Sequence, residues 1–202
     1  MNTEAIQELA EMIKNGNITA KINDHYKQLT QNPKLLISLQ NEASDRMNTS
    51  LIERMIDVPI GNDLSFTDKS GNQIHIADFI GKTIVIDCWA TWCAPCIGAL
   101  PAMEKLAEKY QENPDVVFLF LNTQDSRGRK RAVELFSKNY SGLNLLFDEA
   151  NVAGAFLGVS GLPTKLVIDR NQHIRFRHVG LSGSMQQQMD ELSAMIEVSQ
   201  KN

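Results

Sequence analysis

Two cysteines separated by two residues, Cys93 and Cys96, are the residues of this chain best suited to chemistry. They follow an apolar run, 83–88, that predicts a buried strand, and they precede a helical segment, 97–110. A C-x-x-C pair at a strand-to-helix junction is typical of a redox-active dithiol. The first sulfur would lie at the start of the helix, where free N–H groups and the helix dipole favour a thiolate. The second would lie one turn later, within reach of a disulfide.

A structural zinc site is the main alternative use of such a pair. Zinc needs four ligands, and the third cysteine, Cys88, lies on the predicted strand while the four histidines show no ligand spacing. We therefore expect no metal, and no cofactor other than a redox-active disulfide between Cys93 and Cys96. Cys88 is expected to be a small buried hydrophobic residue, with a regulatory thiol as the other interpretation.

Composition excludes several classes of protein. A length of 202 residues suits one domain with an appendage, and 43% hydrophobic and 22% charged residues are ordinary for a globular protein. A net charge of -4 argues against nucleic-acid binding. No run approaches the roughly 18 apolar residues of a membrane span. The first residues lack the basic start and apolar stretch of a secretory signal, so we expect either a cytoplasmic protein or a chain whose signal was removed.

Residues 1–57 predict a helical region without any chemical motif. Apolar stripes predict helices at 6–13 and 18–29, a third beginning at 35–43, and a short fourth capped by Ser50. We expect this region to pack on the main domain or on another copy of the chain, which leaves an oligomer possible.

From residue 58 strands and helices alternate, which predicts a mixed α/β sheet flanked by helices. A hairpin is expected around 68–72, before the first core strand. The other expected strands are 82–89, 116–121, 143–147, 165–169 and 175–179, and the expected helices are 94–110, 129–140, 149–156 and 185–199. We therefore divide the chain into a helical N-terminal region, 1–57, and an α/β domain, 58–202.

Two distant segments carry a family resemblance. The segment 85–96, VIDCWATWCAPC, resembles the active-site segment of the thioredoxin superfamily. The segment 161–164, GLPT, resembles the cis-proline loop of that fold, and Gly180 matches a glycine that typically follows it. The hairpin and the strand–helix unit at 143–156 are similar to the TlpA/ResA-type branch, which consists of exported, often membrane-tethered thiol–disulfide oxidoreductases. The resemblance implies a thioredoxin-like fold with an N-terminal β-hairpin.

The resemblance also implies roles for three residues. Cys93 would be the nucleophile, because only a thiolate attacks a disulfide, and Cys96 would be the resolving thiol. Asp87 matches a buried aspartate of thioredoxins. Burial raises the pKa of a carboxyl group, which would allow Asp87 to take the proton of Cys96. The alternative is an aspartate at the end of a strand that faces solvent.

A substrate-binding surface is implied around the dithiol. Trp92 would be an exposed flat contact surface beside Cys93, and Pro95 would stiffen the dithiol loop. A cis peptide bond is expected between Leu162 and Pro163, with the backbone of Leu162 pairing with an extended substrate segment. The residues expected to bind substrate are Trp92, Ala94, Pro95, Gly161, Leu162 and Pro163.

Two departures from the family pattern concern proton transfer. Ala99 stands where many TlpA/ResA-type proteins carry a glutamate, so Asp87 would act alone. The lysine that pairs with the buried aspartate of thioredoxins is expected to be absent, because Phe120 lies near its position.

These features predict an enzyme, a thiol–disulfide oxidoreductase that reduces protein disulfides. It would need an upstream electron donor, such as a membrane reductant, and the resemblance favours the bacterial periplasm or cell envelope, with the cytoplasm as the alternative. DsbA-like oxidants carry a histidine just before the second cysteine, whereas this chain has Pro95, which favours a low reduction potential.

Two other functions remain open. A peroxiredoxin-like peroxidase would carry a proline and a threonine at set distances before the reactive cysteine, where this chain has Ile86 and Ala90. A thioredoxin-like interaction module could bind a partner through residues 1–57, although an intact dithiol argues against a scaffold without chemistry.

Overall fold

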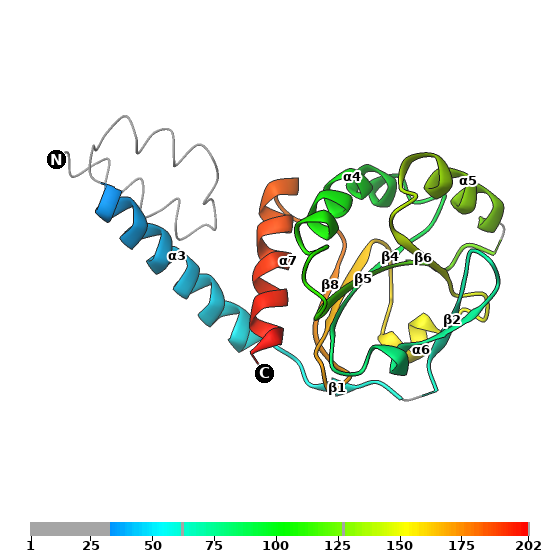
Figure 1. The fold of residues 1–202 in the computed structure, drawn as a ribbon, viewed down its shortest axis with the longest axis horizontal. Coiled ribbons are helices and arrows are strands. Elements are labelled where there is room, and N and C mark those ends of the chain that lie inside the picture. The colour runs from blue at the N-terminus through cyan, green and yellow to red at the C-terminus, as the bar shows by residue number, and fades with distance from the viewer. Residues whose placement is uncertain (1–32, 62, 127, 202) are drawn as a thin grey trace.

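The computed structural model describes residues 33–61, 63–126 and 128–201 (Figure 1). The first two expected helices, within residues 1–32, lie outside these ranges. The helices are α3 (Pro33–Arg54), α4 (Ala94–Lys109), α5 (Arg129–Asn139), α6 (Ala153–Leu157) and α7 (Met185–Gln200), with a 3-10 turn η1 (Ile76–Phe79). The strands are β1 (Val58–Pro59), β2 (Ser65–Asp68), β3 (Gln73–His75), β4 (Thr83–Trp89), β5 (Val116–Asn122), β6 (Asn144–Phe147), β7 (Thr164–Ile168) and β8 (His173–Val179).

One eight-stranded sheet forms the centre of the molecule, in the order β1-β8-β7-β4-β5-β6-β2-β3. β4, β5 and β6 run parallel, joined by the crossover helices α4 and α5. The other neighbouring strands are antiparallel, including the hairpin of β2 and β3 that precedes β4. The expected mixed sheet flanked by helices, with its hairpin, is confirmed.

The central strand β4 is buried on both faces and separates two cores. Val85 and Trp89 belong to a core that includes side chains of α4, α5 and α7, whereas Ile86 and Cys88 belong to a core that includes α6 and the hairpin. Figure 1 shows α4 and α5 on one side of the sheet and α6 on the other. Because side chains alternate along a strand, Asp87 points toward the face of Val85 and Trp89.

A single helix, α3, spans 33–54 where the sequence predicts two segments separated at Ser50. The expected break is wrong, because no glycine or proline interrupts the chain between Pro33 and Arg54. The polar residues there bond along the helix instead of capping a new one. The Thr49 hydroxyl donates to the carbonyl of Asp45, and the Ser50 carbonyl accepts from Arg54.

The C-terminal end of α3 packs against α7 (Figure 1). Leu51 is completely buried in the core shared with α4 and α7, and Arg54 pairs with Glu191 of α7 at 2.8 Å. Part of the helical region therefore packs on the α/β domain, one of the two arrangements that the sequence left open.

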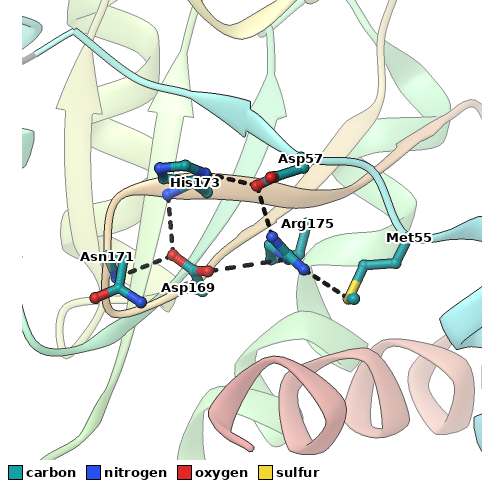
Figure 2. A network of polar contacts seen from close by, with 6 residues as sticks. All are labelled: Met55, Asp57, Asp169, Asn171, His173 and Arg175. Carbon is teal, nitrogen blue, oxygen red and sulfur yellow. Dashed lines mark hydrogen bonds and ion pairs between the residues drawn. The ribbon is translucent and has the colours of Figure 1, made fainter. Parts of the chain in front are cut away.

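Asp57 joins the end of this helical region to β8 (Figure 2). Its carboxylate lies 2.6 Å from His173 Nδ1 and 2.6 Å from Arg175 Nη1. The next residues form β1, a two-residue strand paired with β8 that the sequence pattern missed. A run this short that contains a proline gives no strand periodicity.

The helix expected at 149–156 begins later, at Ala153. The carboxylate of Asp148 accepts the backbone N–H groups of Val152 and Ala153, at 2.8 and 3.0 Å. The preceding residues form a loop in which Asn151 has φ 52°, outside the helical region of backbone conformation. Asp148 thus sets where α6 begins.

Candidate dithiol active site

Cys93 and Cys96 form a disulfide at the start of α4, with their Cα atoms 5.3 Å apart. Cys93 is the N-cap residue of α4, and its sulfur accepts the backbone N–H of Cys96 at 3.3 Å. Pro95 lies in the first helical turn, where the missing N–H leaves no helical hydrogen bond unmade. One of the two sulfurs therefore occupies the position in which a helix terminus stabilises negative charge.

The disulfide lies below an exposed rim. Cys93 and Cys96 are 3% and 2% exposed, whereas Trp92 is 60% exposed and Ala94 and Pro95 are exposed as well. The two sulfurs therefore lie beneath these three exposed residues.

The loop after β5 forms hydrogen bonds to the exposed rim and to the residue before it. The Trp92 indole Nε1 donates to the carbonyl oxygen of Gln124 at 2.9 Å, and the Thr91 backbone N–H donates to the Asp125 carboxylate at 2.7 Å. Gln124 has φ 55°, a left-handed conformation that few residues other than glycine adopt. The sequence pattern did not single out either residue of this loop, although a polar run, 122–125, follows the apolar strand and could have indicated them.

The cis-proline loop lies at the same end of the sheet as the dithiol. The Leu162–Pro163 peptide bond is cis, as expected, and Gly180 donates its N–H to the Pro163 carbonyl at 2.7 Å. In the antiparallel pairing of β7 with β4, Thr164 lies opposite Cys88. The residues before Thr164 therefore extend in the direction in which β4 leads to Cys93.

The side chains of this loop fit a binding role. Leu162 is half-buried against the core that contains both cysteines. A Cβ atom on Gly161 would lie an ordinary 3.7 Å from Val179 Cγ1, so packing within the chain does not require glycine there. Val179 and Leu181 add exposed apolar surface next to the loop.

Asp87 is buried and paired with a lysine. Its carboxylate oxygen Oδ1 lies 3.5 Å from Lys165 Nζ, and the two side chains are 3% and 5% exposed. Burial excludes the solvent-facing alternative for Asp87. The lysine of the thioredoxin pattern is absent from its position, as expected, but a different lysine pairs with Asp87. Phe120 does lie beside Asp87 on β5, but Lys165 lies opposite it on the other neighbouring strand, β7. The sequence feature that could have indicated this partner is a lysine within the otherwise apolar run 164–168.

Burial raises the pKa of the Asp87 carboxyl, and the nearby Lys165 ammonium opposes that rise. Neither Asp87 Oδ1 nor Lys165 Nζ makes a hydrogen bond in the part of the chain that the structure describes. The two groups therefore interact chiefly as opposite charges.

Cys88 lies on the opposite face of β4 from the dithiol. It is completely buried, and burial raises the pKa of its thiol well above the usual range. A thiol in this position stays protonated and unreactive near neutral pH. Its expected place as a buried hydrophobic residue agrees with the structure.

Among residues 33–201, leaving aside positions 62 and 127, no three histidine, cysteine, aspartate or glutamate side chains gather as metal ligands would. The same residues include no helix long and apolar enough to cross a membrane.

Comparison with known proteins agrees with this geometry. The sequence model of the Redoxin family matches residues 57–192. The chain belongs to the Redoxin family. It is 31% identical over 131 residues to the thioredoxin-like protein YneN of Bacillus subtilis, a match that covers 63% of this chain and 75% of YneN. It is 34% identical over 110 residues to the thiol-disulfide oxidoreductase ResA of Bacillus thuringiensis, which covers 52% of this chain and 59% of ResA.

Solved structures similar to this Redoxin-family chain are also thiol–disulfide oxidoreductases. A Bacteroides vulgatus protein assigned as a thiol-disulfide oxidoreductase superposes with a TM-score of 0.58 at 29% identity, covering 70% of this chain and 94% of that protein. A Chlorobium tepidum protein assigned as a thiol:disulfide interchange protein DsbE superposes with a TM-score of 0.58 at 25% identity, covering 70% of this chain and 99% of that protein. Together with the disulfide at the start of α4, these relatives identify a thiol–disulfide oxidoreductase.

Proposed function

We propose that this protein reduces disulfides of protein substrates, with Cys93 as the nucleophile and Cys96 as the resolving thiol. The observation that carries the proposal is the placement of the Cys93 sulfur at the N-terminus of α4, beneath an exposed rim. The structure has the dithiol in its oxidised form, which is the product of the reaction proposed here.

The reaction has two displacement steps. The Cys93 thiolate attacks one sulfur of the substrate disulfide, forms a mixed disulfide and expels the other substrate sulfur as a thiolate. Cys96 then loses its proton and attacks the Cys93 sulfur. The mixed disulfide breaks, the Cys93–Cys96 disulfide forms, and the second substrate thiolate leaves. Two electrons pass from the enzyme to the substrate.

Asp87 is the proposed acceptor of the Cys96 proton. It points toward the face of the sheet covered by α4, which carries Cys96, and burial shifts its pKa toward neutrality. Ala99 is 1% exposed and cannot take part in proton transfer, so Asp87 supplies the carboxylate at this site.

The substrate is proposed to bind as an extended segment between the rim and the cis-proline loop. Trp92, Ala94 and Pro95 would contact one side of it, and the backbone of Leu162 would pair with it beside Gly161 and Pro163. The exposed side chains of Trp92, Val179 and Leu181 favour apolar residues next to the substrate cysteine.

The proposed direction of electron flow requires an upstream reductant, and the resemblance to exported reductases favours a membrane donor and a location in the periplasm or cell envelope. Fractionation of cells that produce the protein, followed by immunoblotting, tests the location. Recovery with cytoplasmic markers alone would contradict it.

Reduction of insulin by the reduced protein tests the activity. We expect turnover by the wild type and by a Cys88→Ser variant, and none by Cys93→Ser. Peroxide consumption is measured beside it, because peroxide turnover without insulin reduction would favour the peroxidase and absence of both would favour an interaction module. A glutathione titration is expected to give a potential nearer about -270 mV than about -120 mV, and a value above roughly -180 mV would contradict a reductase.

Trapping identifies the substrates. A Cys96→Ser variant completes only the first displacement, so it should retain substrates as mixed disulfides on Cys93 that mass spectrometry can identify. The Cys93→Ser, Cys96→Ser double variant is the matched control, and proteins captured equally by both variants are not substrates.

A further inference from the structure

Strand β8 is covered on its outer side along only part of its length. β1 pairs with the first two residues of β8, His173 and Ile174. The last contact on this side is the hydrogen bond from the Ile56 N–H to the Arg175 carbonyl, at 2.9 Å. The chain before Ile56 belongs to α3, which leads away from the sheet (Figure 1). Among the described residues, 176–179 therefore form an open sheet edge.

The backbone groups that face this opening belong to Arg177 and Val179. Alternate residues of an antiparallel strand direct their N–H and C=O groups to opposite neighbours. The Gly180 N–H points inward, since it donates to the Pro163 carbonyl at 2.7 Å, whereas the Arg175 carbonyl points outward. Arg177 and Val179 share the outward direction, where no group of the described residues bonds to their backbone.

We propose that this edge binds a second extended segment of the protein substrate, acidic in character, by adding it to the sheet as a strand next to β8. The inference rests on the proposed function of the dithiol, and it adds a contact that is separate from the reacting disulfide. The added strand exchanges backbone hydrogen bonds with Arg177 and Val179, and its side chains decide which substrates fit.

The edge lies close enough to the dithiol for one substrate to contact both. Val179 lies opposite Thr164, which in turn lies opposite Cys88 on β4. Two strand spacings of about 4.8 Å therefore separate the end of β8 from the strand that leads to Cys93. An interface of ordinary size covers about 800 Å² of each partner, so a single protein can span this distance.

The charges along β8 favour an acidic segment. The strand carries two histidines and two arginines and no carboxylate: His173, Arg175, Arg177 and His178. Arg175 is already paired with Asp57. Arg177 is exposed and donates its Nε–H to the Leu157 carbonyl at 2.9 Å. It pairs with no carboxylate of the described residues, so its guanidinium can bind one of the substrate.

A second copy of the chain fits this edge less well than a substrate does. Pairing two β8 strands would bring the same basic residues together, and like charges across a strand pair are destabilising. Val179, two residues after Arg177 on the same face, is 48% exposed and offers an apolar contact. The expected segment therefore carries acidic and apolar residues in turn on one face.

The test uses a synthetic peptide as substrate. It contains a disulfide-bonded cysteine, a flexible glycine–serine linker, and a strand in which glutamate and valine alternate on one face and threonine forms the other. The control peptide has lysine in place of glutamate. We expect the KM of the acidic peptide to be about tenfold lower than that of the control at equal kcat. Equal KM values for the two peptides would overturn the proposal.

Arg177→Pro separates the contribution of the backbone from that of the side chain. Proline lacks the outward N–H, which takes no part in the ladder with β7. Relative to Arg177→Ala, which keeps that N–H, Arg177→Pro should raise the KM of the acidic peptide about fivefold at unchanged kcat. Both variants should reduce hydroxyethyl disulfide, which has no peptide backbone, at the wild-type rate. The same KM in both variants would contradict strand addition.

Hydrogen exchange of the wild-type protein, followed by NMR, covers the case in which a variant fails to fold. The acidic peptide with serine in place of cysteine should protect the amides of Arg177 and Val179, and its N-methylated form should not. Unchanged exchange of both amides would show the proposal to be wrong. So would a wild-type dimer that is lost in Arg177→Pro, because a second copy would then occupy the edge. Absence of insulin reduction by the wild type would instead contradict the proposed function itself.

Discussion

The backbone N–H of Cys96 is directed at the sulfur of Cys93, 3.3 Å away, whereas the Cys96 sulfur accepts no such bond in the described structure. A donor of this kind favours a thiolate on Cys93 once the disulfide is reduced. We expect Cys93 to react first with iodoacetamide near neutral pH, as measured by peptide mass spectrometry. Cys88 should remain unlabelled until the protein unfolds, since it is completely buried. Faster labelling of Cys96 than of Cys93 would reverse the two roles.

Leu51 tests how far the helical region contributes to the stability of the α/β domain. It is completely buried, whereas its neighbour Ile52 is 56% exposed. We expect Leu51→Ala to lower the free energy of unfolding by about 2–5 kcal/mol, because it leaves a cavity in the core shared with α7. Ile52→Ala is the matched control and should change it little. Urea denaturation measures both, and equal small effects would show that α3 does not stabilise the domain.

The order of strands and helices could be predicted from the sequence because most elements show their own periodicity. The apolar run of β4 and the C-x-x-C motif that follows it determine where the dithiol lies. β1 could not be predicted in this way, since two residues carry no period and their pairing with β8 depends on tertiary contacts. The continuous α3 was missed because polar residues at 48–50 read as a cap, although they also fit a helix interior.

The partner of Asp87 shows a different limit. A family pattern indicates at which position a partner is usual, and Phe120 occupies that position here. Charge compensation, however, requires only proximity, and a strand in a sheet has two neighbours. Lys165 satisfies the same requirement from β7, on the other side. Such a relationship follows from the register of two strands, which the sequence alone does not specify.

Asp57 should make the attachment of α3 sensitive to acid. Hydrogen bonding to His173, with the charge of Arg175, lowers the pKa of this carboxyl below its ordinary value of 3.8. A carboxyl group whose pKa is lower in the folded protein than in the unfolded chain stabilises the fold at pH values above its unfolded-state pKa. This stabilisation is lost as the pH falls through the folded-state pKa. We expect protection of the Ile56 amide, which bonds to the Arg175 carbonyl at 2.9 Å, to decrease in that acid range.

Hydrogen exchange followed by NMR measures this protection, with Asp57→Asn as the control. The variant should show reduced protection at all pH values, with no further loss in acid. A wild-type protein whose Ile56 protection matches the variant at neutral pH would show that the Asp57 contacts do not hold this junction.

Asp87 and Lys165 should also be coupled in stability. Removing a buried carboxylate that had no partner would stabilise the protein. Asp87→Leu alone, however, leaves the Lys165 ammonium buried without its partner, and breaking a buried pair costs about 3–5 kcal/mol. Replacing both, in Asp87→Leu with Lys165→Met, should restore or exceed wild-type stability by up to about 4 kcal/mol. Urea denaturation of the oxidised proteins at neutral pH measures all three.

The pH dependence of this stability has a defined sign. Because burial raises the folded-state pKa of Asp87, the folded protein holds the proton to higher pH than the unfolded chain does. The wild type should therefore lose stability as the pH rises from the ordinary pKa of an aspartate carboxyl through the raised pKa of Asp87 in the folded protein. The double variant, which lacks this carboxyl, should not show that loss. A double variant no more stable than the weaker single variant would mean that the two side chains are not energetically coupled. Their 3.5 Å approach would then be a consequence of strand register alone.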